Sequence, residues 1–280
     1  MLTRRELATI AAAIKGLTHY LQPVSTTPRL DAELLIAHAL ERPRSFLYTY
    51  PEQNLTEERQ RLLLDAIERR QQGEPIAYIL GYKEFWSLEL TVTKDTLIPR
   101  PETEHIVEWA LANLPLSTAT IADMGTGSGA IAIALAHERP LWRIHATDSS
   151  AAALTIAINN AQRHQLNNIE FYLGPWYDAL PDQYYTAIIS NPPYIAADDP
   201  HLQQLTHEPY TALCAKDNGL AAFKFIIEHA KQHLLPGGKL ILEHGYNQAL
   251  QLTKLMQHAG FQHIESYCDL AKHTRFIVGS

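Results

Sequence analysis

The segment Asn191-Pro192-Pro193-Tyr194 combines residue types that can hold a planar –NH2 group. It follows an apolar run over residues 185–190, which predicts a buried strand of a parallel sheet, so the segment is expected where open α/β sheets bind ligands. Proline has no backbone N–H and a fixed φ, so two in succession form a stiff turn with bare carbonyl acceptors. The Asn191 oxygen and a proline carbonyl can each accept one hydrogen while Tyr194 packs against the group's face. The alternative is a turn that only ends the strand.

A glycine turn lies between an apolar run at 120–124 and an apolar stretch at 130–136. The turn consists of Gly125, Thr126, Gly127, Ser128 and Gly129. A strand, a glycine turn and a helix in succession let the backbone approach a ligand closely, and the helix N-terminus favours a carboxylate or phosphate. The spacing Gly125-x-Gly127-x-x-Ala130 also satisfies the dinucleotide fingerprint, so the turn alone leaves the ligand open. Asp148, 19 residues after Gly129, is expected to bind ribose hydroxyls in either case.

Two features favour S-adenosylmethionine over NAD. The compact glycine turn follows the acidic Asp123, which suits an amino-acid moiety whose ammonium needs a negative neighbour. The stronger feature is the turn 191–194, because hydride transfer has no use for an amide clamp. Together they predict methyl transfer to an –NH2 group by in-line displacement, catalysed by orientation and by hydrogen-bond acceptors. No general base is nominated among the 14 histidines.

The amino-terminal residues 1–72 predict a small helical bundle. Apolar residues recur at helical spacing from Leu7 to Leu21, a second helix is expected at Thr27-Pro28, and a third follows the cap Thr56. The arginines of the third helix are interpreted as a solvated face, with partner binding as the alternative. They are Arg59, Arg61, Arg69 and Arg70. Residues 73–95 are expected to form a β-hairpin connector, with strands at 81–86 and 88–92.

Residues 96–280 predict an α/β catalytic domain, because strands alternate with helices as in a parallel sheet covered on both faces. Strands are expected at 120–124, 142–147, 169–173, 185–190 and 239–243, and helices at 129–138, 150–164, 219–235 and 247–259. A final pair of strands, 263–267 and 274–278, should be antiparallel because no helical pattern separates them. The sequence Pro236-Gly237-Gly238 is expected to end a helix and turn the chain into the strand at 239–243.

Five segments resemble motifs of the PrmC/HemK family of release factor glutamine methyltransferases. They are Asp-x-Gly-Thr-Gly-Ser-Gly at 123–129, Asn-Pro-Pro-Tyr at 191–194, Ile-Pro-Arg-Pro-Glu-Thr-Glu at 98–104, Leu-Glu-His-Gly at 242–245 and Pro-Ile-Ala-Tyr-Ile-Leu-Gly at 75–81. The resemblance implies a seven-stranded class I (Rossmann-like) S-adenosylmethionine-dependent methyltransferase domain with a helical substrate-recognition domain before it. It also implies methylation of the side-chain amide nitrogen of the glutamine in the Gly-Gly-Gln motif of class 1 peptide chain release factors, in support of translation termination.

The resemblance also assigns site residues. The donor, which leaves as S-adenosyl-L-homocysteine, is expected to contact Gly125 to Gly129, Asp148, Trp176 and Asn191. The acceptor glutamine is expected to contact Asn191, Pro192, Pro193 and Tyr194. One position departs from the pattern, because many such methyltransferases carry an acid after the third strand that binds the adenine amine, whereas this chain has Gly174-Pro175-Trp176. Adenine is therefore expected to pack on Trp176. The alternative is that Trp176 is a loop aromatic that only covers the edge of the core.

The composition of the chain indicates which classes of partner and which compartment to expect. A net charge of −7, from 30 acidic and 23 basic residues, gives no global attraction to nucleic acid. Cys214 and Cys268 lack the spacing of metal ligands, and no stretch of about 18 apolar residues occurs, so a cytoplasmic protein without a membrane span is expected. A monomer is expected as well.

Three alternative functions stay open: a ribosomal-protein glutamine methyltransferase, a nucleobase exocyclic-amine methyltransferase, and a non-catalytic helical adaptor with a vestigial cofactor fold.

Overall fold

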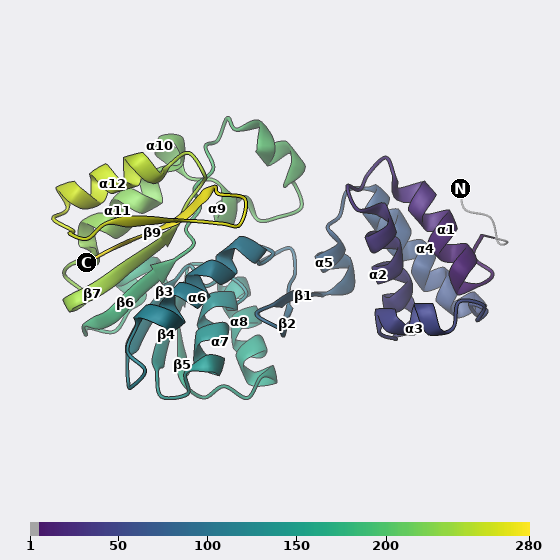
Figure 1. Ribbon diagram of the computed structural model, residues 1–280, viewed down its shortest axis with the longest axis horizontal. Coiled ribbons are helices and arrows are strands. Elements are labelled where there is room, and N and C mark those ends of the chain that lie inside the picture. Colours follow the sequence, from purple (N-terminus) through teal and green to yellow (C-terminus); the bar gives the residue numbers. More distant parts are fainter. Residues whose placement is uncertain (1–5) are drawn as a thin grey trace. The chain divides into compact units, whose positions relative to one another are not determined.

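The computed structural model describes residues 6–280, and the chain divides after Tyr82 into two compact units. The first unit is helical, and the second, Lys83–Ser280, contains a large sheet with helices (Figure 1). This division runs through the connector expected at 73–95, whose first residues form a helix of the amino-terminal unit.

The amino-terminal unit contains five helices among its described residues. They are α1 (Ile10–Leu21), α2 (Pro28–Leu40), α3 (Arg44–Thr49), α4 (Glu57–Gln71) and α5 (Ile76–Leu80). Threonine side chains cap the N-termini of α1 and α4. The side chains of Thr9 and Thr56 accept hydrogen bonds from the N–H groups of Ala12 and Arg59, respectively. The periodic apolar residues form one core, to which α3 contributes Leu47 and α5 contributes Ile79. The short helices α3 and α5 have too few turns to show an apolar period, and the sequence did not predict them.

The interpretation of the α4 arginines as a solvated face is wrong for Arg70. The Arg70 side chain is only 16% exposed, and its Nε lies 2.9 Å from Oδ2 of the buried Asp31. Arg69 forms two hydrogen bonds with Glu74, and Arg59 pairs with Glu41. Arg61 alone of the four is mostly exposed, with Glu57 at 3.9 Å. Local sequence could not reveal the partner of Arg70, because Asp31 lies on a different helix.

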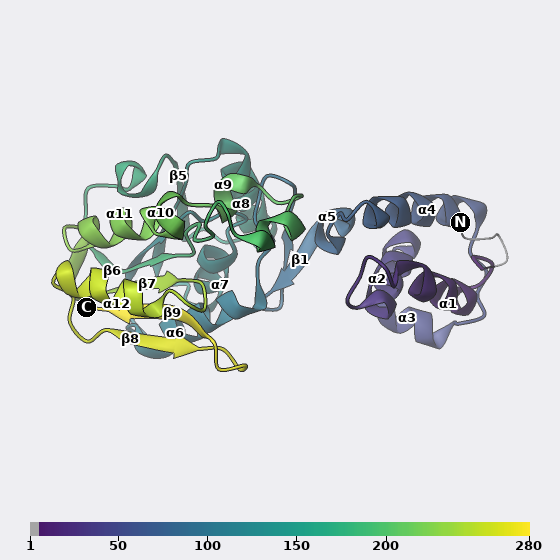
Figure 2. The ribbon, with the colours of Figure 1, turned by 90° about the horizontal axis from the view of Figure 1, so that it is seen from above.

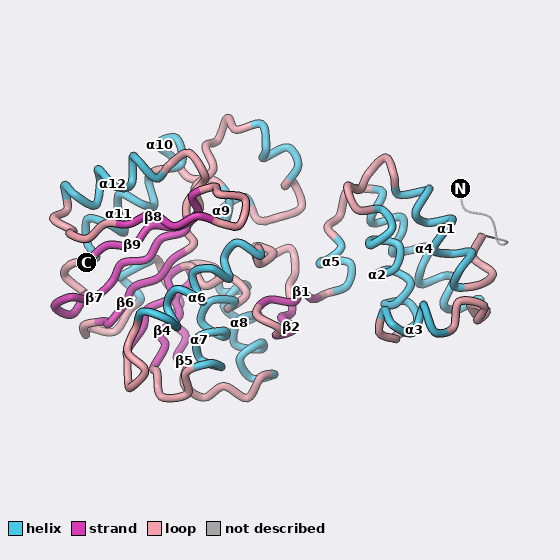
Figure 3. Tube along the Cα trace, viewed as in Figure 1, coloured by secondary structure: helices cyan, strands magenta, loops and turns pink. Residues whose placement is uncertain are grey.

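The second unit begins with a two-stranded sheet and continues into alternating strands and helices (Figure 3). The pair is β1 (Tyr82–Phe85) and β2 (Leu88–Thr91). The strands of the large sheet are β3 (Thr120–Met124), β4 (Arg143–Asp148), β5 (Ile169–Leu173), β6 (Tyr185–Ser190), β7 (Leu234–Glu243), β8 (Glu265–Cys268) and β9 (Thr274–Gly279). The α-helices are α6 (Glu104–Asn113), α7 (Ala130–Glu138), α8 (Ala151–Arg163), α9 (Tyr210–Leu213), α10 (Lys216–Gly219), α11 (Ala221–Ala230) and α12 (Ala249–His258). Three 3₁₀ turns complete the unit: η1 (Pro101–Thr103), η2 (Trp176–Ala179) and η3 (Pro200–Gln204).

The large sheet has the order β5-β4-β3-β6-β7-β9-β8. Its first five strands are parallel, β9 runs antiparallel to β7, and β8 runs antiparallel to β9, as expected for the final pair. The strand order changes direction at β3, which has β4 on one side and β6 on the other. Ligands of open α/β sheets bind at such a switch point, beyond the carboxyl ends of the strands. The seven-stranded class I methyltransferase fold is confirmed.

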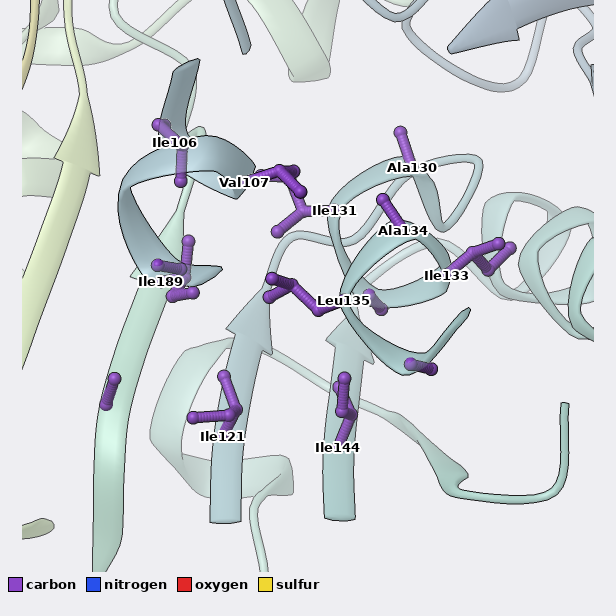
Figure 4. Close-up of a cluster of buried hydrophobic side chains, with 14 of the residues drawn as sticks. Ile106, Val107, Ile121, Ala130, Ile131, Ile133, Ala134, Leu135, Ile144 and Ile189 are labelled. Carbon is purple, nitrogen blue, oxygen red and sulfur yellow. The ribbon is translucent and has the colours of Figure 1, made fainter. Parts of the chain in front are cut away.

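Helices cover both faces of the sheet (Figure 2). On one face, Ile121 of β3, Ile144 of β4 and Ile189 of β6 pack against α6 and α7 (Figure 4). The other face carries Met124, Ile188 and their neighbours against α11 and α12. Because side chains alternate along a strand, the apolar runs of the sequence supply both layers at once.

One boundary differs from the expectation by several residues. The predicted helix at 219–235 ends at Ala230, and β7 begins at Leu234 rather than at residue 239. Leu234 pairs with Tyr185 and Lys239 pairs with Ala187, so the intervening residues form a bulge that contains Pro236-Gly237-Gly238. A Cβ on Gly238 would lie 2.9 Å from the Leu235 carbonyl oxygen, so glycine permits this close approach of the backbone.

Residues 6–280 include no helix long and apolar enough to cross a membrane. Within the same range, no group of three or more His, Cys, Asp or Glu residues is placed to hold a metal ion. Cys214 and Cys268 are free thiols, and Cys268 is exposed.

Candidate active site

A pocket of about 360 Å³ lies beyond the carboxyl ends of the central strands. Its walls come from the segment before α6, the glycine turn, the end of β4, the residue that opens η2, the turn after β6, and α9 with the residue before it. The lining includes Leu97, Arg100, Thr103, Asp123, Gly125, Thr126, Gly127, Ser128, Asp148, Trp176, Asn191, Pro193, Pro209, Thr211 and Ala212. Most residues predicted from the sequence for donor binding therefore share one cavity.

The glycine turn needs glycine for two separate reasons. Gly125, Gly127 and Gly129 have φ values of 72°, 58° and 87°, a region that other residues rarely adopt. In addition, a Cβ on Gly129 would lie 2.8 Å from Cδ1 of Ile133 and 3.2 Å from Cβ of Ala157, so glycine also allows α7 and α8 to pack closely. The turn is anchored to β4, because the N–H groups of Gly125 and Thr126 both donate to the Thr147 carbonyl at 2.9 Å.

Asp123 places a buried carboxylate beneath the glycine turn. Its side chain lines the pocket although the residue is only 1% exposed. Its Oδ2 accepts hydrogen bonds from Oγ1 of Thr126 at 2.6 Å and from the N–H of Ala132 at 3.2 Å. Burial raises the pKa of Asp123 to about 6, and the nearby Asp148 acts in the same direction. A positive ligand group in the pocket would stabilise the ionised form.

Asp148 ends β4 and closes the adjacent side of the pocket. Its Oδ2 accepts from the N–H of Gly127 at 2.9 Å, and its Oδ1 accepts from the N–H of Ser150 at 2.8 Å. Burial raises the pKa of Asp148 despite these two hydrogen bonds. The carboxylate is thus held by two backbone N–H groups and lines the cavity.

Trp176 lies directly across from the glycine turn. The Cβ position of Gly125 is 3.6 Å from Cζ3 of the Trp176 ring, and the tryptophan has a φ of 44°. Its neighbour Tyr177 is anchored in the core, where the hydroxyl donates to the Ile226 carbonyl at 2.8 Å and the ring stacks on His233. Anchoring of Tyr177 therefore fixes the position from which Trp176 reaches into the pocket.

The turn after β6 stands between two cavities. Asn191 and Pro193 line the main pocket, and Asn191 and Tyr194 line a smaller pocket of about 90 Å³. Pro192 is buried and lines neither pocket. Burial, with a contribution from the nearby Glu243, raises the pKa of the Tyr194 hydroxyl, which stays protonated at neutral pH. Within this turn, Asn191 is thus the residue that lines both cavities.

The position of Tyr194 depends on two residues that the sequence did not single out. The Tyr194 carbonyl accepts a hydrogen bond from Nε2 of Gln248 at 3.0 Å, and Oε1 of Gln248 accepts from the N–H of Gly245. Gly219 passes so close that its Cβ would lie 2.1 Å from the same carbonyl oxygen. The sequence signal for Gly219 is its place after Asp217 and Asn218, which also have positive φ, but such a turn does not name its contact.

Segment 98–104 also belongs to the site. Arg100 lines both pockets, and Thr103 lines the main one. Oγ1 of Thr103 donates to Oε2 of Glu243 at 2.7 Å. Burial raises the pKa of Glu243 to about 7. Arg100 precedes η1 and Thr103 ends it, so this turn positions both residues at the pocket. Their local sequence indicated only the start of a helix.

Comparison with known families and proteins agrees with this geometry. Residues 12–81 match the family described as the PrmC N-terminal domain, and residues 107–278 match the methyltransferase small domain. A release factor glutamine methyltransferase of Coxiella burnetii is 55% identical, covering 83% of this chain and 84% of the relative. The enzyme of the same name from Vibrio cholerae is 44% identical over 97% of this chain and 96% of its own length.

Solved structures with low identity support the fold. The hMettl16 catalytic domain is 16% identical with a TM-score of 0.60, covering 88% of this chain and 90% of that one. A methyltransferase from Pyrococcus furiosus is 17% identical with a TM-score of 0.54, covering 80% and 98%. The glycine turn and the Asn-Pro-Pro-Tyr turn share one site, and the similarity to curated relatives extends over nearly the full length. This chain therefore belongs to the family of release factor glutamine methyltransferases.

Proposed function

We propose that this chain transfers a methyl group from S-adenosyl-L-methionine to the side-chain amide nitrogen of the glutamine in the Gly-Gly-Gln motif of class 1 peptide chain release factors. The observation that carries the proposal is the place of Asn191, which is shared by the main pocket and the smaller one. A donor in the first pocket and an amide in the second would meet at this residue. The curated relatives named for this activity support the choice of acceptor.

The main pocket fits the donor in the chemistry of its walls. The carboxylate of Asp123 suits the ammonium of the methionine moiety, and the N-terminus of α7 suits its carboxylate. Asp148 suits the ribose hydroxyls, and the Trp176 ring offers a stacking surface for adenine in place of the acid found in many relatives of this fold. Bound there, S-adenosylmethionine supplies a methyl group activated by its sulfonium sulfur, and S-adenosyl-L-homocysteine remains.

The turn 191–194 would orient the acceptor. An amide nitrogen is a weak nucleophile because its lone pair is delocalised into the carbonyl. We propose that the Asn191 oxygen and a proline carbonyl accept hydrogen bonds from its two N–H groups, which aims the lone pair at the methyl group and stabilises the positive charge that grows on nitrogen. The nitrogen becomes acidic as it gains the methyl group, and its spare proton leaves to water. Tyr194 would pack against the amide face, and Pro192 and Pro193 stiffen the turn.

For the helical unit we propose a role in recognising a second region of the release factor. A Gly-Gly-Gln tip alone offers little surface, and a second contact raises the effective concentration of the glutamine at the site. The enzyme would act in the cytoplasm, as a monomer, and without direct contact to nucleic acid.

The test offers labelled S-adenosylmethionine with four acceptors in parallel: a class 1 release factor, ribosomal proteins, tRNA and DNA. We expect label in the release factor alone, and no label when its Gly-Gly-Gln glutamine is replaced by asparagine. Label in a ribosomal protein or a nucleic acid, with none in the release factor, would overturn the proposal. Absence of label in all four, with a folded protein, would favour a non-catalytic adaptor.

A further inference from the structure

Glu208 is a buried carboxylate in a segment that is otherwise poorly buried. The segment follows the turn 191–194, runs through η3 and α9, and returns beside its starting point. There the N–H of Ile195 donates to the Leu213 carbonyl and the N–H of Ala215 donates to the Ile195 carbonyl. Between residues 196 and 212, Glu208 is the single buried residue. An acid therefore occupies the place where a loop would normally be anchored by an apolar side chain.

The carboxylate is satisfied by two groups from another part of the chain. Oε1 of Glu208 accepts from Nη2 of Arg100 at 2.5 Å, and Oε2 accepts from the N–H of Ile98 at 3.1 Å. The Glu208 side chain is 3% exposed, so the hydrogen bonds to this charge are little weakened by water. Two donors on residues 98 and 100 define both the position and the register of the loop, which one apolar contact would not do.

The two joined segments both line the site. From the first segment, Leu97 and Arg100 line both pockets. From the second, Ala212 lines both pockets, Pro209 and Thr211 add to the main pocket, and Leu205 and Leu213 add to the smaller one. The smaller pocket is thus bounded by the segment before α6, by the turn 191–194 and by the loop that Glu208 attaches.

We infer that Glu208 is a positioning residue for the acceptor: its carboxylate fixes the loop 196–212 against Ile98 and Arg100 and so maintains the wall of the acceptor pocket. This inference rests on the proposed function, since it assigns the smaller pocket to the acceptor amide. In the proposed function the donor is held mainly by the glycine turn, Asp123 and Asp148, none of which is a hydrogen-bond partner of Glu208. Loss of the attachment should therefore impair the acceptor more than the donor.

The test compares Glu208→Ala and Glu208→Gln with Asp199→Asn in the full-length protein. Asp199 is a matched control, because it is an acid of the same loop that bonds only locally, to His201. Glutamine has nearly the shape of Glu208 and can accept a hydrogen bond from the N–H of Ile98, but it lacks the negative charge that pairs with Arg100.

For Glu208→Ala we expect KM for the release factor to rise about 10-fold or more, the Kd for S-adenosylmethionine to change by less than about 3-fold, and Tm to fall only slightly. The glutamine variant should be intermediate and the control unchanged.

Hydrogen exchange without any substrate gives a second readout. In Glu208→Ala, amides of residues 196–212 should exchange faster while those of β3 and β4 stay protected. Unchanged exchange in the loop, or an unchanged KM, would overturn the inference. Equal losses in donor affinity, acceptor KM and Tm would reduce Glu208 to a structural residue and overturn it as well. Failure of the wild-type enzyme to methylate a release factor would instead remove the proposed function, a result that the exchange experiment does not depend on.

Discussion

Oγ of Ser190 donates a hydrogen bond of 2.7 Å to the carbonyl of Met124, and both residues are fully buried. These two residues are partners in the register of β6 and β3, and each is the last residue of its strand. The glycine turn starts directly after Met124 and the Asn-Pro-Pro-Tyr turn starts directly after Ser190. One hydrogen bond thus joins the two strand ends from which these turns begin, and the proposed chemistry depends on both turns.

Replacement of Asn191 tests the clamp. Asn191→Ala should lower single-turnover methyl transfer to a release factor by about 100-fold or more, because the acceptor amide loses one of its two orienting partners. Donor affinity, measured by calorimetry, should survive in part, since the glycine turn and Asp148 remain. A near-normal rate would remove Asn191 from the catalytic role.

Replacement of Asp148 tests the donor site. Asp148→Ala should weaken S-adenosylmethionine binding by about 1–3 kcal/mol, the range of hydrogen bonds to a charged group. Asp148→Asn removes the charge but keeps the side-chain shape and an acceptor for the N–H of Ser150. Comparison of the two variants therefore separates the effect of charge on donor affinity from that of shape. Calorimetry that gives the wild-type affinity for both variants would place the ribose elsewhere.

The unfolding free energy should depend on pH through Asp123. Its pKa in the folded protein, about 6, lies above the ordinary value of 3.8, so between these values the folded state binds more protons than the unfolded state. Stability therefore falls as pH rises from about 4 to 6 and levels off above about pH 6, with a total loss of about 3 kcal/mol because the pKa is raised from 3.8 to about 6. Asp123→Asn should lack this contribution and be the more stable protein at pH 7 by urea denaturation. A variant less stable than wild type at both pH 4 and pH 7 would contradict this account.

Donor affinity should show the opposite pH trend at the same residue. If Asp123 faces the donor ammonium, binding favours the ionised carboxylate, so affinity should increase as pH rises from about 5 to 7. In Asp123→Asn the increase should be much smaller, although Asp148, whose pKa is also raised by burial, can retain part of it. Calorimetry at pH 5, 6 and 7 on both proteins measures the difference. Parallel curves for the two would place the ammonium away from Asp123.

Gly219 offers a test of the support beneath Tyr194. Gly219→Ala combines a φ of 82° with a Cβ only 2.1 Å from the Tyr194 carbonyl oxygen, so the turn 191–194 must shift. We expect at least 10-fold slower methyl transfer and a stability loss of about 1–3 kcal/mol. Gly237→Ala is the matched control, because Gly237 has a φ of 76° and open space around its Cβ position. The control should lose about 1 kcal/mol of stability and no activity. Equal activity losses in both variants would leave the Tyr194 contact without a role.

Much of the site could be predicted because its parts are local in sequence. A glycine turn between a strand and a helix, an acid at the end of the next strand, and an Asn-Pro-Pro-Tyr turn are each recognisable within about ten residues. The alternation of strands and helices then predicted a parallel sheet, and a parallel sheet gathers its strand ends on one edge. The helical unit was also predictable, except for α3 and α5, which are too short to show a period.

The sequence by itself determined the class of fold, the two turns and the acids Asp123 and Asp148, because residue type and spacing along the chain carry that information. The tertiary structure alone decided which residues support these turns. Glu208 reaches Arg100 across 108 positions of the chain, and Gln248 reaches Tyr194 across 54. The burial of a charged side chain and the close approach of Gly219 likewise depend on neighbours that only the folded chain brings together. Local propensity describes single segments, whereas the walls of the smaller pocket are made by contacts between them.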